Sequence, residues 1–179
     1  DLHFTIADHH RAGHELKYYP GEINLRMADV VVINKVDTAK EEDIKTVEEN
    51  VKKVNPNARI IKATSPIHVE GDIRGKRVLV IEDGPTLTHG EMPYGAGTIA
   101  AQQNNAIIIE AKKYAVGSIK ETFEKYPHLD KILPAMGYGE KQIKELEETI
   151  NSADCDAVVA ATPINLARII NVNKPVIRV

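Results

Sequence analysis

The chain has 179 residues, of which 42% are hydrophobic and 27% charged, and its formal net charge is −3. This balance is typical of a globular protein and excludes the strongly basic surface that nucleic acid or an acidic membrane would favour. No apolar run approaches the ~20 residues of a membrane span and no signal-peptide pattern is present, so we expect a cytoplasmic protein without a membrane partner. Cys155 is the single cysteine, which excludes an intramolecular disulfide.

Segments rich in β-branched residues alternate with helical patterns, which predicts an α/β fold: a mainly parallel sheet flanked by helices, Rossmann-like or P-loop-NTPase-like, in three layers. Strands are expected near residues 2–7, 29–34, 58–63, 76–82, 106–110, 156–161 and 175–179. Helices are expected at 39–54, 96–104, 117–126, 139–152 and 163–170. Turn-forming dipeptides between residues 66 and 75 predict a boundary there. We therefore expect a nucleotide-binding portion at 1–70 and a Rossmann-like unit at 76–179.

A loop rich in histidine, residues 8–15, follows the first expected strand and reads Asp-His-His-Arg-Ala-Gly-His-Glu. Its Arg and His donors suit phosphate oxygens, so anion or substrate binding is one interpretation, with Arg11 and His14 as its first candidates. His10 and His14 are four residues apart and would suit a transition-metal site if they shared a helical face, although Gly13 makes a regular helix doubtful. A structural role is the remaining alternative, and we assign no metal ligand.

Residues 30–37 read Val-Val-Val-Ile-Asn-Lys-Val-Asp, an apolar strand that ends in the Asn-Lys-x-Asp pattern of GTP-binding proteins. Ligands of open parallel sheets bind at the carboxyl ends of the strands. The carboxylate of Asp37 would accept two hydrogen bonds from guanine, a pair that adenine cannot offer. Lys35 would cover one face of the base, and Asn34 would join neighbouring loops. The alternative is a helix cap at Asp37 and Thr38.

Two short strings end later strands. Thr64 and Ser65 follow the strand at 58–63, where many GTP-binding proteins present a backbone loop to the guanine oxygen. Thr162 and Pro163 follow the strand at 156–161 and predict a helix start, with Thr162 as the N-cap and Pro163 at the first helical position.

A Gly- and Thr-rich loop at 84–98 leaves one expected strand and enters an expected helix. This order of elements can point backbone N–H groups at an anion, although the Gly-Lys-Ser/Thr of a phosphate-binding loop is missing. Glu82 or Asp83 could hold Mg²⁺. Candidates for contact with phosphoryl oxygens are Thr86, Thr88 and His89. The alternative is a turn-rich connection whose glycines serve sterics only.

Several strings occur in a fixed order: Arg11-x-Gly13-His14-Glu15, Tyr19-Pro20-Gly21-Glu22, residues 24–29, the Asn-Lys-Val-Asp tetrad, residues 82–90, Tyr94-Gly95-Ala96-Gly97 and residues 123–128. Together they resemble the predicted GTPases related to archaeal cyclic 2,3-diphosphoglycerate synthetase, over essentially the whole chain. Members of that family are longer and carry a Lys-containing phosphate loop and an acidic Mg²⁺ motif upstream. The resemblance thus implies a carboxyl-terminal half that is inactive alone.

The resemblance implies GTP and Mg²⁺ as cofactors, with ATP as the alternative nucleotide, and a small phosphorylated acid as the substrate. For the synthetase itself it implies ATP-dependent closure of 2,3-diphosphoglycerate into a phosphoanhydride, which needs a cationic cradle for two phosphates. The cradle candidates are Arg11, His14, Lys17, Arg26 and His89. Because the Asn-Lys-x-Asp tetrad favours guanine, we favour the GTPase branch. A GTP-switched metal-delivery protein is a further alternative, and a homo-oligomer is left open.

Overall fold

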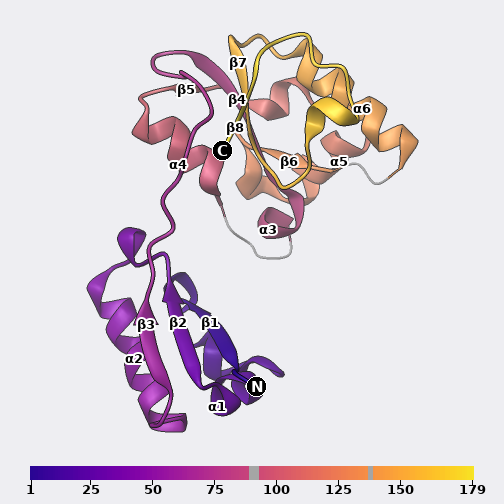
Figure 1. Cartoon of the computed structure of the whole chain (residues 1–179). Helices are drawn as coiled ribbons and strands as arrows, with labels where there is room; N and C mark the ends of the chain where they lie inside the picture. Colours follow the sequence, from indigo (N-terminus) through magenta and orange to yellow (C-terminus); the bar gives the residue numbers. More distant parts are fainter. Residues whose placement is uncertain (89–92, 137–138) are drawn as a thin grey trace. The chain divides into compact units, whose positions relative to one another are not determined.

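The computed structural model describes residues 1–88, 93–136 and 139–179, and it divides into two compact units, Asp1–Pro66 and Ile67–Val179 (Figure 1). In both units parallel strands form a sheet with helices packed against it. The α/β class predicted from the alternating pattern is confirmed. Among the described residues, no helix has the length and apolar character needed to cross a membrane.

The first unit is built around the strand that ends in Asn34. Its elements are β1 (Phe4–Asp8), the 3-10 turns η1 (His9–Arg11) and η2 (His14–Leu16), α1 (Gly21–Met27), β2 (Val30–Asn34), the 3-10 turn η3 (Val36–Thr38), α2 (Glu41–Val54) and β3 (Arg59–Lys62). The sheet order is β1-β2-β3 with parallel pairing, and the register sets Asp8 beside Asn34 and Ile33 beside Lys62. The loops that follow these strands therefore meet at one edge of the sheet.

The core of the first unit lies between one face of this sheet and the helices. On α2 the apolar residues Ile44, Val47 and Val51 recur at helical spacing and are buried. They pack in one cluster with Leu25 of α1 and with Ala7, Val31 and Ile33 of the sheet. The alternate residues of β1 point to the other face, where Phe4 and Ile6 are 57% and 70% exposed.

The second unit has a larger sheet. Its elements are β4 (Arg77–Asp83), α3 (Gly84–Thr88), α4 (Ala96–Gln103), β5 (Ile107–Ile108), the 3-10 turn η4 (Ala111–Tyr114), α5 (Gly117–Lys125), the 3-10 turn η5 (Pro127–Leu129), β6 (Leu133–Ala135), α6 (Glu140–Ser152), β7 (Ala157–Ala161), the 3-10 turn η6 (Leu166–Arg168) and β8 (Val176–Arg178). The strand order is β5-β4-β7-β8, β6 also pairs with β4, and all pairs are parallel.

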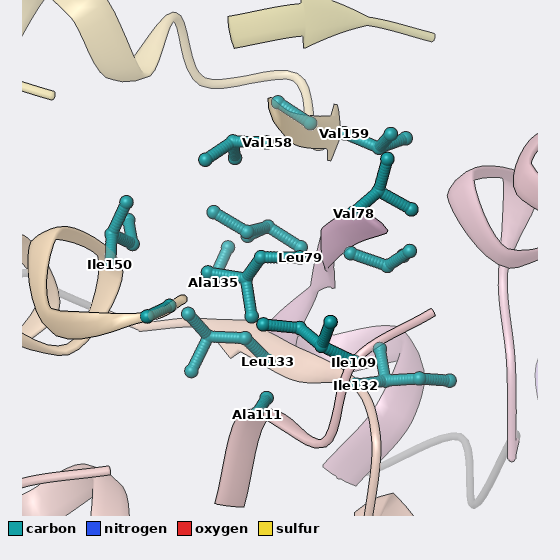
Figure 2. Packing of buried hydrophobic residues seen from close by; sticks show 14 of the residues in the cluster. Val78, Leu79, Ile109, Ala111, Ile132, Leu133, Ala135, Ile150, Val158 and Val159 are labelled. Carbon is teal, nitrogen blue, oxygen red and sulfur yellow. The ribbon is translucent and has the colours of Figure 1, made fainter. Parts of the chain in front are cut away.

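The central strand β4 is buried on both faces, because Val78, Leu79, Val80 and Ile81 are all inaccessible to solvent. A continuous apolar run of this kind is typical of a parallel strand covered by helices on both sides. Figure 2 shows the side chains of β4, β6, β7 and α6 gathered in one packed cluster. Cys155 lies half-buried at the edge of this cluster.

Some elements were missed for local reasons. Strand β6 contains Pro134, which has no N–H to donate to a neighbouring strand, so the sequence gives little strand signal there. Helix α1 begins directly after Tyr19-Pro20, a dipeptide that reads as part of a turn. The short helix α3 lies within the segment predicted as a Gly- and Thr-rich loop.

The helix predicted at 163–170 is wrong. Only Leu166–Arg168 forms a 3-10 turn, and its N-cap position is Asn165. The backbone N–H of Ile164 donates to the hydroxyl oxygen of Thr162 at 3.4 Å. Thr162 therefore closes a local turn on its own backbone, a well-known alternative to capping a helix.

Candidate functional site

The loop after β2 begins with a left-handed residue. Lys35 has φ 59° and ψ 32°, a conformation that turns the chain sharply out of the strand. The turn η3 follows and carries Asp37, whose side chain is exposed. Helix α2 starts only at Glu41, with Lys40 in the N-cap position. Asp37 therefore does not cap that helix.

The carboxylate of Asp37 is held by the next loop of the same sheet edge. The backbone N–H of Ser65 donates to Asp37 Oδ1 at 3.0 Å. The loop of Ser65 is itself fixed, because Val36 N donates to Ala63 O at 3.1 Å and Ala63 N donates to Ile33 O at 2.9 Å. A carboxylate has about four lone-pair positions, so acceptor capacity remains on Asp37 for a ligand.

The other residues of the tetrad lie at the same edge. Asn34 is half-buried at the end of β2. The Lys35 side chain is exposed, and its Nζ lies 3.6 Å from Asp8 Oδ2 at the end of β1. Thr64 is exposed between Ala63 and Ser65. The structure thus brings Asn34, Lys35, Asp37 and the loop of Ser65 to one edge, which is the place expected for ligands of a parallel sheet.

The carbonyl of Lys35 lies beside His9, which the sequence did not single out, and is linked through Thr38 to His10, which was considered with His14 as a metal ligand. His9 is 1% exposed, and its Nε2 lies 2.8 Å from Lys35 O. The hydroxyl of Thr38 also donates to Lys35 O, at 3.1 Å, and lies 3.3 Å from Nε2 of His10. The rings of His9 and His10 are 4.0 Å apart between centroids. Burial, followed by the charge of His9, lowers the pKa of His10 below its ordinary value.

Four of the five residues predicted to cradle phosphates belong to the first unit; the fifth, His89, lies outside the described residues. Arg11 is half-buried in η1, whereas His14 is exposed in η2 with its ring edge-on to Tyr18 at 5.0 Å. Gly13, with φ 96°, separates the two turns, so His10 and His14 share no helical face. Lys17 is exposed after η2.

Arg26 lies on α1 and is already engaged. Its Nε and Nη2 donate to Glu22 Oε1 at 3.0 and 2.7 Å, within the same helix. The histidine-rich loop is anchored by Glu15, which accepts from Gly13 N at 2.8 Å and from Asn50 Nδ2 at 2.6 Å. The cationic cradle therefore stays a prediction.

In the second unit the residues at the start of α4 lie around a buried carboxylate. Glu82 is 2% exposed. Its Oε1 accepts from Thr98 N at 2.8 Å, Thr98 Oγ1 at 2.9 Å and Gly95 N at 3.1 Å, and its Oε2 accepts from Gly97 N at 3.3 Å. Burial raises the pKa of Glu82 above its ordinary value, although these hydrogen bonds act in the opposite direction. The start of α4 is thus directed at a carboxylate of the protein itself.

Gly95 and Gly97 leave no room for a larger side chain. A Cβ on Gly97 would lie 2.9 Å from the Cβ of Ala161 and 3.1 Å from Val80 Cγ1, and one on Gly95 would collide with the Glu82 carboxylate. The other candidates lie nearby in sequence. Asp83 is half-buried at the end of β4, and Thr88 donates its hydroxyl to Gly84 O at 2.9 Å. Thr86 belongs to α3, and His89 lies outside the described residues. Their ligand roles stay predictions.

A hollow of about 490 Å³ in the second unit was not marked by any sequence pattern. Its lining combines both charge signs with hydroxyl, amide and apolar groups, and includes Tyr94, Gln102, His128, Asp130 and Lys131. The Nε2 of His128 is fixed 3.1 Å from Leu87 O. A volume of this order accommodates a small molecule.

Comparison with known proteins finds a match within the first unit. Residues 3–62 match the family model described as CobW/HypB/UreG, nucleotide-binding domain. This segment contains β1, β2 and the whole Asn-Lys-x-Asp tetrad. It is therefore related to GTPase-like nucleotide-binding domains, and a nucleotide is its expected partner.

The whole chain is also similar to a longer protein. It is 63% identical over 182 residues to Arginine synthetase ArcE of Thermococcus kodakarensis, an alignment that covers 100% of this chain. The chain spans 41% of the length of that relative. The similarity to a synthetase extends through both units.

Proposed function

We propose that the first unit recognises the guanine base of GTP within a nucleotide-dependent synthetase. The observation that carries the proposal is the carboxylate of Asp37, which accepts the Ser65 N–H at 3.0 Å. Asp37 lies in the segment 3–62 that matches a nucleotide-binding domain. Guanine presents its ring N–H and exocyclic amine side by side, and a carboxylate accepts both. Adenine places an acceptor where guanine places a donor, so it would set lone pairs against the carboxylate.

Lys35 and Asn34 complete the base site in this proposal. The left-handed turn at Lys35 leaves its long aliphatic stem exposed at the sheet edge, where the stem can cover one face of a base. Within the 179 residues no Gly-Lys-Ser/Thr loop is present, so recognition here rests on the base, and Mg²⁺ would arrive with the phosphates. In this proposal the phosphates are contacted by three donors of this unit, Arg11, His14 and Lys17.

For the reaction, we propose nucleotide-driven formation of the last C–N bond of the arginine guanidino group, from a precursor amino acid and a nitrogen donor, with the terminal phosphate of the nucleotide released as inorganic phosphate. The support is the 63% identity to an arginine synthetase over the whole chain. The mixed charge of the 490 Å³ hollow suits a zwitterionic amino acid, with Lys131 facing the carboxylate and Asp130 the ammonium group. The runner-up is ATP-dependent phosphoanhydride formation from a small phosphorylated acid, which the ordered motifs suggest. The two differ in product.

Two measurements test the proposal. Calorimetry of the 179-residue chain with GDP and ADP should give a guanine preference of about tenfold or more, and equal affinities would contradict the base assignment. For the reaction, the full-length protein is given GTP or ATP with candidate precursor amino acids and nitrogen donors, and products are identified by mass spectrometry. Arginine formed together with nucleotide diphosphate supports the synthetase. A cyclic phosphoanhydride would favour the runner-up.

A further inference from the structure

We propose that Asp8, His9 and His10 bind a divalent first-row transition-metal ion at the carboxyl end of β1. One ligand atom from each of these residues lies within 4.8 Å of those of the other two. The local fold gathers them, because β1 ends at Asp8 and η1 begins at His9, and the Asp8 Oδ1 accepts the N–H of His10 at 3.0 Å. The site needs no nucleotide and is independent of the proposed function.

The ring of His9 is fixed through Nε2, and its Nδ1 has no hydrogen-bond partner among the described residues. A carbonyl oxygen only accepts, so the contact of 2.8 Å between Nε2 and Lys35 O requires the proton to be on Nε2. The lone pair of Nδ1 then has no donor. This atom is buried and has no hydrogen-bond partner within the part of the chain that the structure describes. A buried polar atom of this kind costs about 1–3 kcal/mol unless something satisfies it.

The ring of His10 is set in the same way. The Thr38 hydroxyl has a single proton, which it donates to Lys35 O at 3.1 Å. Towards His10 the same oxygen must therefore accept, so Nε2 of His10 carries the proton across their 3.3 Å contact. The Nδ1 lone pair of His10 remains available. Histidines that bind metals commonly donate their other N–H to a carbonyl or a similar oxygen, which fixes the tautomer and the ring.

The donor set indicates the class of ion. Two neutral imidazoles and one carboxylate suit Zn²⁺, Co²⁺ or Ni²⁺, whereas Mg²⁺ and Ca²⁺ prefer oxygen ligands only. Three protein ligands leave a coordination position for water or another molecule. The Nζ of Lys35 lies 3.6 Å from Asp8 Oδ2, so the ion must compete with this ammonium group for the carboxylate. Removing that charge should tighten metal binding.

The test uses metal alone and the metal-free 179-residue chain. Zn²⁺ binding is measured by calorimetry, and Co²⁺ binding is followed by its visible absorption, which reports imidazole and carboxylate coordination. We expect one ion per chain. His10→Ala should raise the Kd by at least about tenfold, since it removes an exposed ligand without disturbing the core. Lys35→Met should lower the Kd several-fold.

The matched control is His14→Ala, which removes an exposed imidazole from the neighbouring turn and should leave the Kd unchanged. His9→Ala also empties a buried position, so it is interpreted only if circular dichroism matches the parent chain. Asp8→Asn, which keeps the side-chain shape, gives the second ligand test and should also weaken binding about tenfold. Equal affinities for the parent chain, His10→Ala and Asp8→Asn would overturn the proposal. Equal loss in His10→Ala and His14→Ala would also overturn it.

Discussion

The two units treat the same order of elements in opposite ways. In each, a central parallel strand ends in polar residues and is joined to a later helix: β2 to α2 through the 3-10 turn η3 in the first unit, and β4 to α4 by a segment that begins with the short helix α3 in the second. In the first, the acidic residue Asp37 stays exposed and is steadied by one backbone N–H. In the second, Glu82 is buried and accepts hydrogen bonds from the backbone N–H groups at the start of α4. In the second unit the N–H groups at the start of α4 are therefore already occupied by a carboxylate of the protein, whereas the first-unit carboxylate keeps acceptor capacity for a ligand.

The largest effect is expected from Glu82→Ala. The substitution leaves the N–H groups of Gly95, Gly97 and Thr98 and the Thr98 hydroxyl without their acceptor in a buried place. We expect the free energy of unfolding of the second unit to fall by about 3 kcal/mol or more. Denaturant unfolding followed by circular dichroism measures it. Glu110→Ala is the control, because Glu110 is an exposed residue of the same unit paired with Lys113, and its loss should change little. Equal effects of the two substitutions would mean that Glu82 does not organise the loop.

The corresponding change in the first unit should alter binding and leave stability almost intact. Asp37→Asn replaces a pure acceptor by an amide that also donates, which suits xanthine better than guanine. We expect the preference for GDP over xanthosine diphosphate to fall by at least about tenfold, or about 1.4 kcal/mol. Competition calorimetry measures the ratio. Glu41→Gln removes an equally exposed charge at the start of α2 and should not change it. An unchanged ratio in Asp37→Asn would remove Asp37 from base recognition.

The pH dependence of stability separates the two carboxylates further. Burial raises the pKa of Glu82 in the folded chain, so between the unfolded and folded pKa values the folded state binds more protons. Its contribution to stability is then fully present below the unfolded pKa and is lost as the pH rises through the folded pKa. The unfolding free energy of the parent chain relative to Glu82→Gln should therefore fall from acidic to neutral pH. Chemical denaturation at several pH values checks this, and a rising difference would contradict the sign.

Elements with a local sequence pattern could be predicted, whereas those that depend on tertiary pairing could not. Periodicity is local, so Val30–Asn34 and the stripe of Ile44, Val47 and Val51 were recognised as strand and helix without tertiary information. The tetrad was found because its residue types are specific. Strand β6 was not predicted because it contains Pro134, which is rare in strands. Its pairing depends on the neighbouring strand β4, which its own sequence pattern does not reveal.

The candidate sites needed distances that no sequence contains. His9 looked like one polar residue in a loop, yet the parallel register of β1 and β2 carries it to the carbonyl of Lys35, 26 positions away in the chain. The role of Glu82 was missed for a similar reason, because its partners lie 13 to 16 positions further on in the loop. The sequence signal for the His9 site was the string Asp8-His9-His10 at the end of an expected strand.

The finest test concerns how Asp37 is held. The contact comes from the backbone N–H of Ser65 and not from its hydroxyl. Ser65→Ala should therefore leave guanine preference unchanged, whereas Ser65→Pro deletes the N–H and should weaken GDP binding by about 1 kcal/mol, or about fivefold. The pair is its own control, because both variants lack the hydroxyl. Calorimetry with GDP measures both. If Ser65→Ala weakened binding as much as Ser65→Pro, the hydroxyl would be the group that matters, and the first-unit carboxylate would be organised by side chains in the way that Thr98 contributes its hydroxyl to Glu82.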